Sequence, residues 1–187
     1  MIKIGITGSL ASGKSTVAKL VSQNKYPLFI ADRTVKSLYK KKYFIKKIKR
    51  QFNLKSTKNL KKKIKEIIKK DKKKLKKLKK IIHPLVRKEM KASMRPRANI
   101  KFSIFEIPLL IESKLVKYFD SIIFVGANKN IRLRRYLQKG GSKKIFTILD
   151  NRQAKSSKKI KISDHVIYNN RSLKVLKKNV KILMHKL

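Results

Sequence analysis

The segment after the first apolar run has the spacing of a phosphate-binding loop. Four residues separate Gly8 from Gly13, and Lys14 and Ser15 follow directly. Glycine adopts backbone angles that other residues resist, so the N–H groups of such a loop can turn inward around phosphate oxygens. The lysine can reach the β- and γ-phosphates, and the hydroxyl after it can bind Mg²⁺. The spacing therefore predicts a site for a nucleoside triphosphate.

The residues on either side of the loop support this interpretation. Residues 2–7 form a short apolar run typical of a buried strand, and residues 17–21 begin a helical pattern. The loop therefore joins a strand to a helix, and the positive end of the helix dipole faces the same anion. The residues expected to hold the nucleotide phosphates here are Gly8, Ala11, Ser12, Gly13, Lys14, Ser15 and Thr16.

Apolar runs and helical periods alternate along the rest of the chain. Further strands are expected at residues 28–32, 100–106, 121–125 and 165–168. Helical periods extend over residues 35–94, 131–139, 144–155 and 173–185. This alternation predicts an α/β fold with a parallel sheet that is covered on both faces.

Positive charge dominates the composition. The chain has 54 basic and 9 acidic residues, a formal net charge of +45. Such a field attracts polyanions, which makes nucleic-acid binding one interpretation. However, only ten of the basic residues are arginine, the residue that base-reading proteins favour for its planar fork. We therefore interpret the excess of lysine as compositional, while noting that it suits an enzyme with polyanionic substrates.

Several functional classes are excluded by composition. There is no cysteine, so disulfides, thiolate catalysis and thiolate zinc sites are excluded. The three histidines, His83, His165 and His185, lie too far apart for a short metal-binding motif. No apolar run approaches the ~20 residues of a membrane span, and the N-terminus does not have the pattern of a signal peptide. We expect a cytoplasmic protein.

The remaining motifs distinguish among nucleotide-binding proteins. Residues 128–130 resemble the start of a GTPase base-recognition motif, but the required aspartate does not follow. The third predicted strand ends in a single acid, Glu106, whereas motor ATPases carry an acidic pair there. An acid at Asp32 and an arginine-rich helix near residues 131–139 favour phosphoryl transfer to a small acceptor instead.

Five stretches follow one another along nearly the whole chain. They are the phosphate loop, Ala31-Asp32, Ile82-His83-Pro84-Leu85-Val86, Ile107-Pro108-Leu109-Leu110-Ile111-Glu112, and Gln153 followed by Ser163-Asp164-His165-Val166-Ile167-Tyr168-Asn169. Together and in this order, they resemble the motifs of the dephospho-coenzyme A kinase family. The resemblance implies a three-layer P-loop kinase fold within a single domain. Its core would comprise residues 1–34, 97–131 and 160–187, with a helical acceptor-binding insertion at 35–96 and a small lid at 132–159.

The resemblance also implies an activity and its cofactors. The reaction would be phosphorylation of the 3′-hydroxyl of dephospho-coenzyme A by ATP with Mg²⁺, the last step of coenzyme A synthesis. The partners would be these small molecules, with no membrane or specific nucleic acid, and the enzyme would be a monomer or a weak oligomer. Two alternatives stay open: a nucleoside or nucleotide kinase on the same fold, and a nucleic-acid-binding P-loop ATPase.

The resemblance assigns further residues to the site. Asp32 would prepare the acceptor hydroxyl, although a helix cap is its alternative role. Arg135 would neutralise charge on the transferred group, while Arg132 and Arg134 are interpreted as part of a solvated basic face. Ser15 would bind Mg²⁺, with Asp32 or Glu106 contributing through water. The remaining assignments are His83, Pro108, Leu109 and Glu112 for the acceptor and Asn169 beside adenine.

Two positions depart from the family pattern. Ile30 replaces the first acid of the family's Asp-Ala-Asp, so Asp32 alone can supply a carboxylate there. Ala11 stands where the loop commonly has glycine, and we expect alanine to be tolerated because the backbone takes a negative φ.

Overall fold

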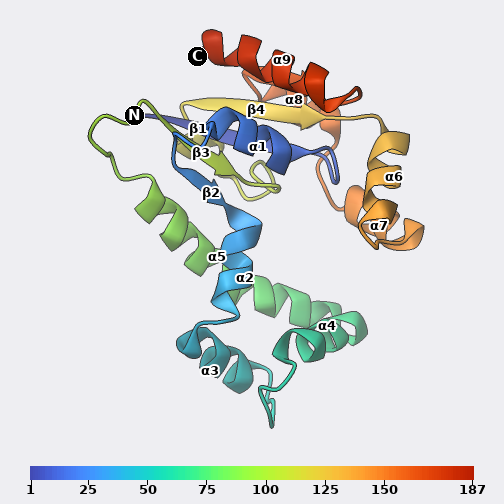
Figure 1. Cartoon of the computed structure of the whole chain (residues 1–187). Helices are drawn as coiled ribbons and strands as arrows, with labels where there is room; N and C mark the ends of the chain where they lie inside the picture. Colours follow the sequence, from blue (N-terminus) through green and yellow to red (C-terminus); the bar gives the residue numbers. More distant parts are fainter. The chain divides into compact units, whose positions relative to one another are not determined.

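The strands of the chain form one parallel sheet. The computed structural model describes the backbone of residues 1–187 and the side chains of all of them except residues 69, 70 and 72. Within it the sheet has the order β2-β3-β1-β4-β5. The strands are β1 (Ile2–Gly8), β2 (Leu28–Ile30), β3 (Phe102–Glu106), β4 (Ser121–Gly126) and β5 (His165–Tyr168). The predicted α/β fold with a parallel sheet is confirmed (Figure 1).

The central strands are apolar because helices and loops cover both of their faces. Ile4 and Ile6 of β1 pack in one core cluster with Val17 of α1 (Lys14–Ser22) and Val180 of α9 (Leu173–His185). On the opposite face β1 has Gly5, where a Cβ atom would lie 2.9 Å from side-chain atoms of both Leu110 and Phe119. The segment after β3 therefore approaches the sheet closely and covers this second face.

The parallel register gathers the carboxyl ends of the strands at one edge of the sheet. Ile6 of β1 pairs with Glu106 of β3, and Gly8 pairs with Val125 of β4. The chain between β4 and β5 forms three helices, α6 (Lys129–Gln138), α7 (Lys143–Asn151) and α8 (Ser156–Lys161), and the 3-10 turn η1 (Val116–Tyr118) precedes β4. In Figure 1 the arrow of β4 points toward α6, so α6 begins at the edge where the phosphate loop lies.

Residues 31–95 form a second compact unit with a core of its own. Its helices are α2 (Ala31–Leu38), α3 (Lys42–Gln51), α4 (Leu60–Lys70) and α5 (Lys72–Ser93). Apolar residues at helical spacing, among them Leu38, Phe44, Ile48, Ile64 and Leu78, are buried together. The helical period expected for this region is thus realised as four separate helices.

Two local predictions need correction. The second strand ends at Ile30, so Asp32 does not end a strand but lies in the first turn of α2, where the helix dipole favours an acid. The helix expected at 144–155 ends already at Asn151 as α7, and a separate helix, α8, begins at Ser156. Helix α5 continues through Pro84, and His83 is a half-buried residue inside this helix. Among the described residues no helix is long and apolar enough to cross a membrane.

Candidate active site

The phosphate loop, residues 8–15, is held in shape by a residue from the far end of the chain. Asn169 follows β5 directly and is buried, and its Nδ2 donates a hydrogen bond to the carbonyl oxygen of Ser12 at 2.9 Å. Gly13 directly precedes α1 with a φ of 95°, and a Cβ atom there would lie 2.3 Å from the same Nδ2. Only glycine allows the two segments to approach this closely. Asn169 therefore fixes the loop immediately before the helix N-terminus.

Ala11 contradicts one expectation. Its φ is 58°, in the left-handed region, whereas a negative φ was expected. The Cβ atom of an L-residue crowds the backbone in this conformation, which is why related loops favour glycine at such a position. The loop therefore imposes a positive φ on alanine.

The Lys14 side chain is buried against the loop itself. It is 8% exposed, and its Nζ donates a hydrogen bond to the carbonyl oxygen of Ser9 at 2.8 Å. The ammonium group therefore lies beside the loop backbone, where a phosphate group would offer it a stronger acceptor.

Ser15 and Glu106 meet at the carboxyl edge of the sheet. The Ser15 hydroxyl donates a hydrogen bond to Glu106 Oε1 at 2.8 Å, and Glu106 is 3% exposed. The other carboxylate oxygen, Oε2, is buried and has no hydrogen-bond partner among the described residues. Mg²⁺ prefers carboxylate, hydroxyl and phosphate oxygens, so this pair fits the ion.

A cavity of about 270 Å³ opens beside the loop. Its lining includes Gly13, Thr16 and Asn169 together with Arg135 of α6. Arg135 donates a hydrogen bond to the carbonyl oxygen of Asn169 at 3.0 Å. Burial, together with the nearby Arg134 charge, lowers the pKa of Arg135 below its usual value. The charged form of an arginine in such surroundings is stabilised when an anion binds beside it.

Arg132 is a residue whose role the sequence did not indicate. It was interpreted as part of a solvated face, but it is buried and pairs with both carboxylate oxygens of Asp150, at 2.6 and 3.1 Å. It also donates to the carbonyl oxygen of Leu10 at 3.2 Å, so it links α7 to the phosphate loop. A signal was present, because Asp150 is one of only nine acids in the chain.

The segment after β3 contacts both β1 and α8. Thr7 donates a hydrogen bond to the carbonyl oxygen of Pro108 at 3.3 Å. Pro108 and Leu109 lie partly exposed in this segment, and Glu112 lies in the turn that follows. Glu112 Oε1 accepts the N–H of Ala154 at 2.9 Å and lies 3.0 Å from Lys159 Nζ. The carboxylate therefore already has two partners.

The remaining predicted residues lie in the helical unit. Asp32 is exposed in the first turn of α2, and His83 is half-buried in α5. Burial, with the charges of Lys79 and Arg87, lowers the pKa of His83 below its usual value, so this imidazole is neutral at pH 7. The roles predicted for Asp32 and His83 stay predictions.

The chain is similar to known proteins over almost its whole length. The family model of dephospho-CoA kinase matches residues 2–174. A dephospho-CoA kinase of Fusobacterium nucleatum is 34% identical over 182 residues, which cover 95% of this chain and 94% of that protein. A dephospho-CoA kinase of Rickettsia typhi is 31% identical over 192 residues, covering 100% and 98%.

Solved structures share the fold of this chain. TT1252 from Thermus thermophilus has a TM-score of 0.83 and 28% identity, covering 100% of this chain and 97% of that one. A dephospho-CoA kinase from Campylobacter jejuni has a TM-score of 0.69 at 22% identity, covering 98% and 96%, and supports the P-loop kinase fold. Because the family model matches residues 2–174, and relatives more than 30% identical are covered over almost their whole length, the chain belongs to the dephospho-CoA kinase family.

Proposed function

We propose that this chain transfers the γ-phosphoryl group of ATP to the 3′-hydroxyl of dephospho-coenzyme A, giving coenzyme A and ADP. Phosphoryl transfer is supported above all by the hydrogen bond of Ser15, at the end of the phosphate loop, to Glu106. The second carboxylate oxygen of Glu106 is buried and has no hydrogen-bond partner among the described residues, so it is available to a metal ion. The choice of acceptor is supported by membership of the dephospho-CoA kinase family.

The donor side of the site uses the loop and the cavity beside it. The amides at the start of α1 bind the phosphates, because Gly13 offers no side chain to cap them. Lys14 leaves the Ser9 carbonyl and binds the β- and γ-phosphates. Ser15 and Glu106 hold Mg²⁺, which when bound neutralises charge on the phosphate oxygens. The cavity that Asn169 and Arg135 line takes the base and the ribose.

The acceptor side rests on fewer residues. Asp32 takes the proton of the 3′-hydroxyl. The hydroxyl oxygen forms the new bond to the γ-phosphorus of ATP, while the bond between that phosphorus and the ADP oxygen breaks. Arg135 stabilises the negative charge that develops on the transferred group. Four further residues are proposed to lie on the acceptor side: His83, Pro108, Leu109 and Glu112.

The proposed division of the chain has three parts. They are a core of residues 1–34, 97–131 and 160–187, an acceptor-binding insertion of residues 35–96, and a lid of residues 132–159.

We further propose that the enzyme works in the cytoplasm as a monomer or a weak oligomer, without a membrane or a specific nucleic acid. The support is the family, whose substrates are small molecules. The net charge of +45 then serves at most to attract two polyanionic substrates, an effect that salt weakens.

Initial rates of ADP formation test this function. Dephospho-coenzyme A, a mixture of nucleosides and nucleotides, and duplex DNA are offered separately to the purified enzyme with ATP and Mg²⁺. We expect rapid turnover with dephospho-coenzyme A alone. Faster turnover with a nucleoside or nucleotide, or ATPase activity stimulated by DNA, would contradict the proposal and favour the corresponding alternative.

Glu106→Gln tests whether Glu106 belongs to the proposed Mg²⁺ site. The amide keeps the hydrogen bond from Ser15 but removes the charge that attracts the metal, so the Mg²⁺ concentration needed for half-maximal rate should rise. Glu66→Gln, an exposed acid on α4, is the control. An unchanged Mg²⁺ requirement in Glu106→Gln would remove Glu106 from the metal site.

A further inference from the structure

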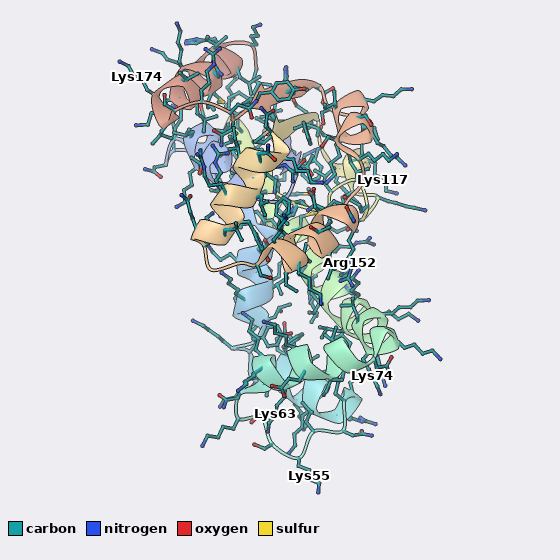
Figure 2. The ribbon with its side chains drawn as sticks, turned by 90° about the vertical axis from the view of Figure 1, so that its right-hand side faces the viewer. Lys55, Lys63, Lys74, Lys117, Arg152 and Lys174 are labelled. Carbon is teal, nitrogen blue, oxygen red and sulfur yellow. The ribbon has the colours of Figure 1, made fainter. Side chains whose placement is uncertain are left out.

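Lys159 differs from most cations of this chain because its side chain is fully buried. Figure 2 shows the common situation, in which labelled residues such as Lys117 and Lys174 point away from the ribbon. Among the described lysines and arginines only Lys14 and Arg132 are also buried, and both contact the phosphate loop. Burying an ammonium group is costly unless it is paired. The burial of Lys159 therefore needs a reason.

Glu112 provides the pair. Its Oε1 lies 3.0 Å from Lys159 Nζ and accepts the backbone N–H of Ala154 at 2.9 Å, and its side chain is 20% exposed. Burial alone would raise the pKa of Glu112, but the hydrogen bonds from Ala154 and from its own N–H, with the Lys159 ammonium, lower it overall. The carboxylate is thus ionised at neutral pH and holds α8 to the segment after β3.

Helix α8 also contacts the phosphate loop. Ser156 lies three residues before Lys159, on the same face of the helix. Its Oγ is 3.1 Å from Ser9 Oγ, and the Ser9 carbonyl accepts the hydrogen bond from Lys14. A continuous series of contacts therefore leads from Glu112 through α8 and Ser9 to the Lys14 ammonium.

We propose that the Glu112–Lys159 ion pair is a positioning element, which holds α8 against the phosphate loop so that Ser156 and Ser9 set the place of Lys14. The inference rests on the proposed function, because Lys14 matters through its contact with the transferred phosphate. Neither Glu112 nor Lys159 needs to touch a substrate in this role. A displacement of ~1 Å at reacting groups costs about 10²-fold in rate, so loss of the pair should lower kcat.

Two variants remove the charges while keeping most of the packing. Lys159→Met retains a long unbranched side chain, and Glu112→Gln retains an oxygen that can accept the N–H of Ala154. Lys161→Met, an exposed lysine on the same helix, is the matched control. Kinetics are measured with ATP and dephospho-coenzyme A varied in turn, well below the melting temperature of each variant.

We expect each charge-removing variant to lower kcat by about 10²-fold, with little change in the KM for dephospho-coenzyme A. The double variant should be no slower than the slower single variant, because both changes break the same contact. Lys161→Met should match the wild type.

Three results would overturn the inference. If Lys159→Met and Glu112→Gln lower the melting temperature but keep kcat, the pair is merely structural. If Glu112→Gln raises the KM for dephospho-coenzyme A while Lys159→Met does not, Glu112 is a substrate contact. If neither the wild type nor Lys161→Met makes ADP with dephospho-coenzyme A, the proposed function is wrong, and the inference that depends on it is wrong as well. Should Lys159→Met not fold, Glu112→Gln decides by the same readouts.

Discussion

The two compact units of this chain differ in the burial of their polar side chains. In the sheet unit, residues 1–30 and 96–187, buried charged side chains bond to less buried polar partners, as in Glu106 with Ser15 and Arg132 with Asp150. Every buried polar or charged side chain among the described residues belongs to this unit. In the helical unit, residues 31–95, the core is apolar and the ion pair Lys41–Glu89 has side chains 40% and 44% exposed.

The difference shows where to look for chemistry in a strongly basic protein. An exposed lysine costs little, so its presence carries little information about function. A buried polar group costs free energy unless it is satisfied, so it persists where structure or catalysis uses it. We therefore expect the sheet unit to carry the phosphate chemistry and the helical unit to contribute only a few exposed groups to it.

The largest effect is expected from Lys14→Ala. Removing a cation that contacts the phosphates in the transition state should lower kcat by at least ~10³-fold. The fold should persist, because Asn169 holds the loop through the Ser12 carbonyl. Turnover and the circular dichroism spectrum of the variant are compared with those of Lys19→Ala, an exposed lysine on α1. Near-normal turnover in Lys14→Ala would disprove the phosphate-loop assignment.

Asp32→Asn asks whether the helical unit supplies the base. The amide keeps the shape but cannot accept the proton, so turnover should fall by ~10²–10⁴-fold while the KM for ATP changes little. Glu66→Gln, another exposed acid of that unit, should have no such effect. A variant that keeps more than about a tenth of wild-type turnover would show that Asp32 is not the base, since the general-base range begins above that factor.

The sequence predicted some features of the fold and of the site and missed others, for physical reasons. The phosphate loop and the strands could be predicted, because glycine spacing and continuous apolar runs have local causes. The burial of Lys159 could not, because one lysine among so many is distinguished only by tertiary contacts. The positive φ of Ala11 was missed for a related reason, since the loop rather than the residue imposes it.

A smaller effect concerns pH and the helical unit alone. Burial, with Lys79 and Arg87, lowers the pKa of His83 in the folded state below the usual 6.5. The unfolded state then binds a proton more readily, so stability from His83 is complete above about pH 6.5 and is lost as the pH falls through its folded pKa. Between about pH 7.5 and about pH 5.5, the wild type should therefore lose stability relative to His83→Gln. Urea denaturation at both pH values measures this, and a parallel loss in both proteins would contradict it.

The smallest effect is expected from Ala11→Gly in the loop. Glycine adopts a φ of 58° without steric crowding, so the substitution should stabilise the protein by about 0.5–1 kcal/mol. Ala92→Gly, at the exposed next-to-last residue of α5, should instead destabilise it by a smaller amount, because glycine has a lower helix propensity and relieves no strain there. Urea denaturation of both variants gives the two signs, and destabilisation by Ala11→Gly would show that the positive φ is not strained.

The most direct test of the central claim is the identity of the phosphorylated product. The wild-type enzyme is incubated with ATP, Mg²⁺ and dephospho-coenzyme A, and the products are analysed by mass spectrometry and phosphorus NMR. The account predicts one new phosphate monoester, on the 3′-oxygen of the ribose, in an amount equal to the ADP formed. ADP without a phosphorylated acceptor, or a phosphate at another position, would contradict it.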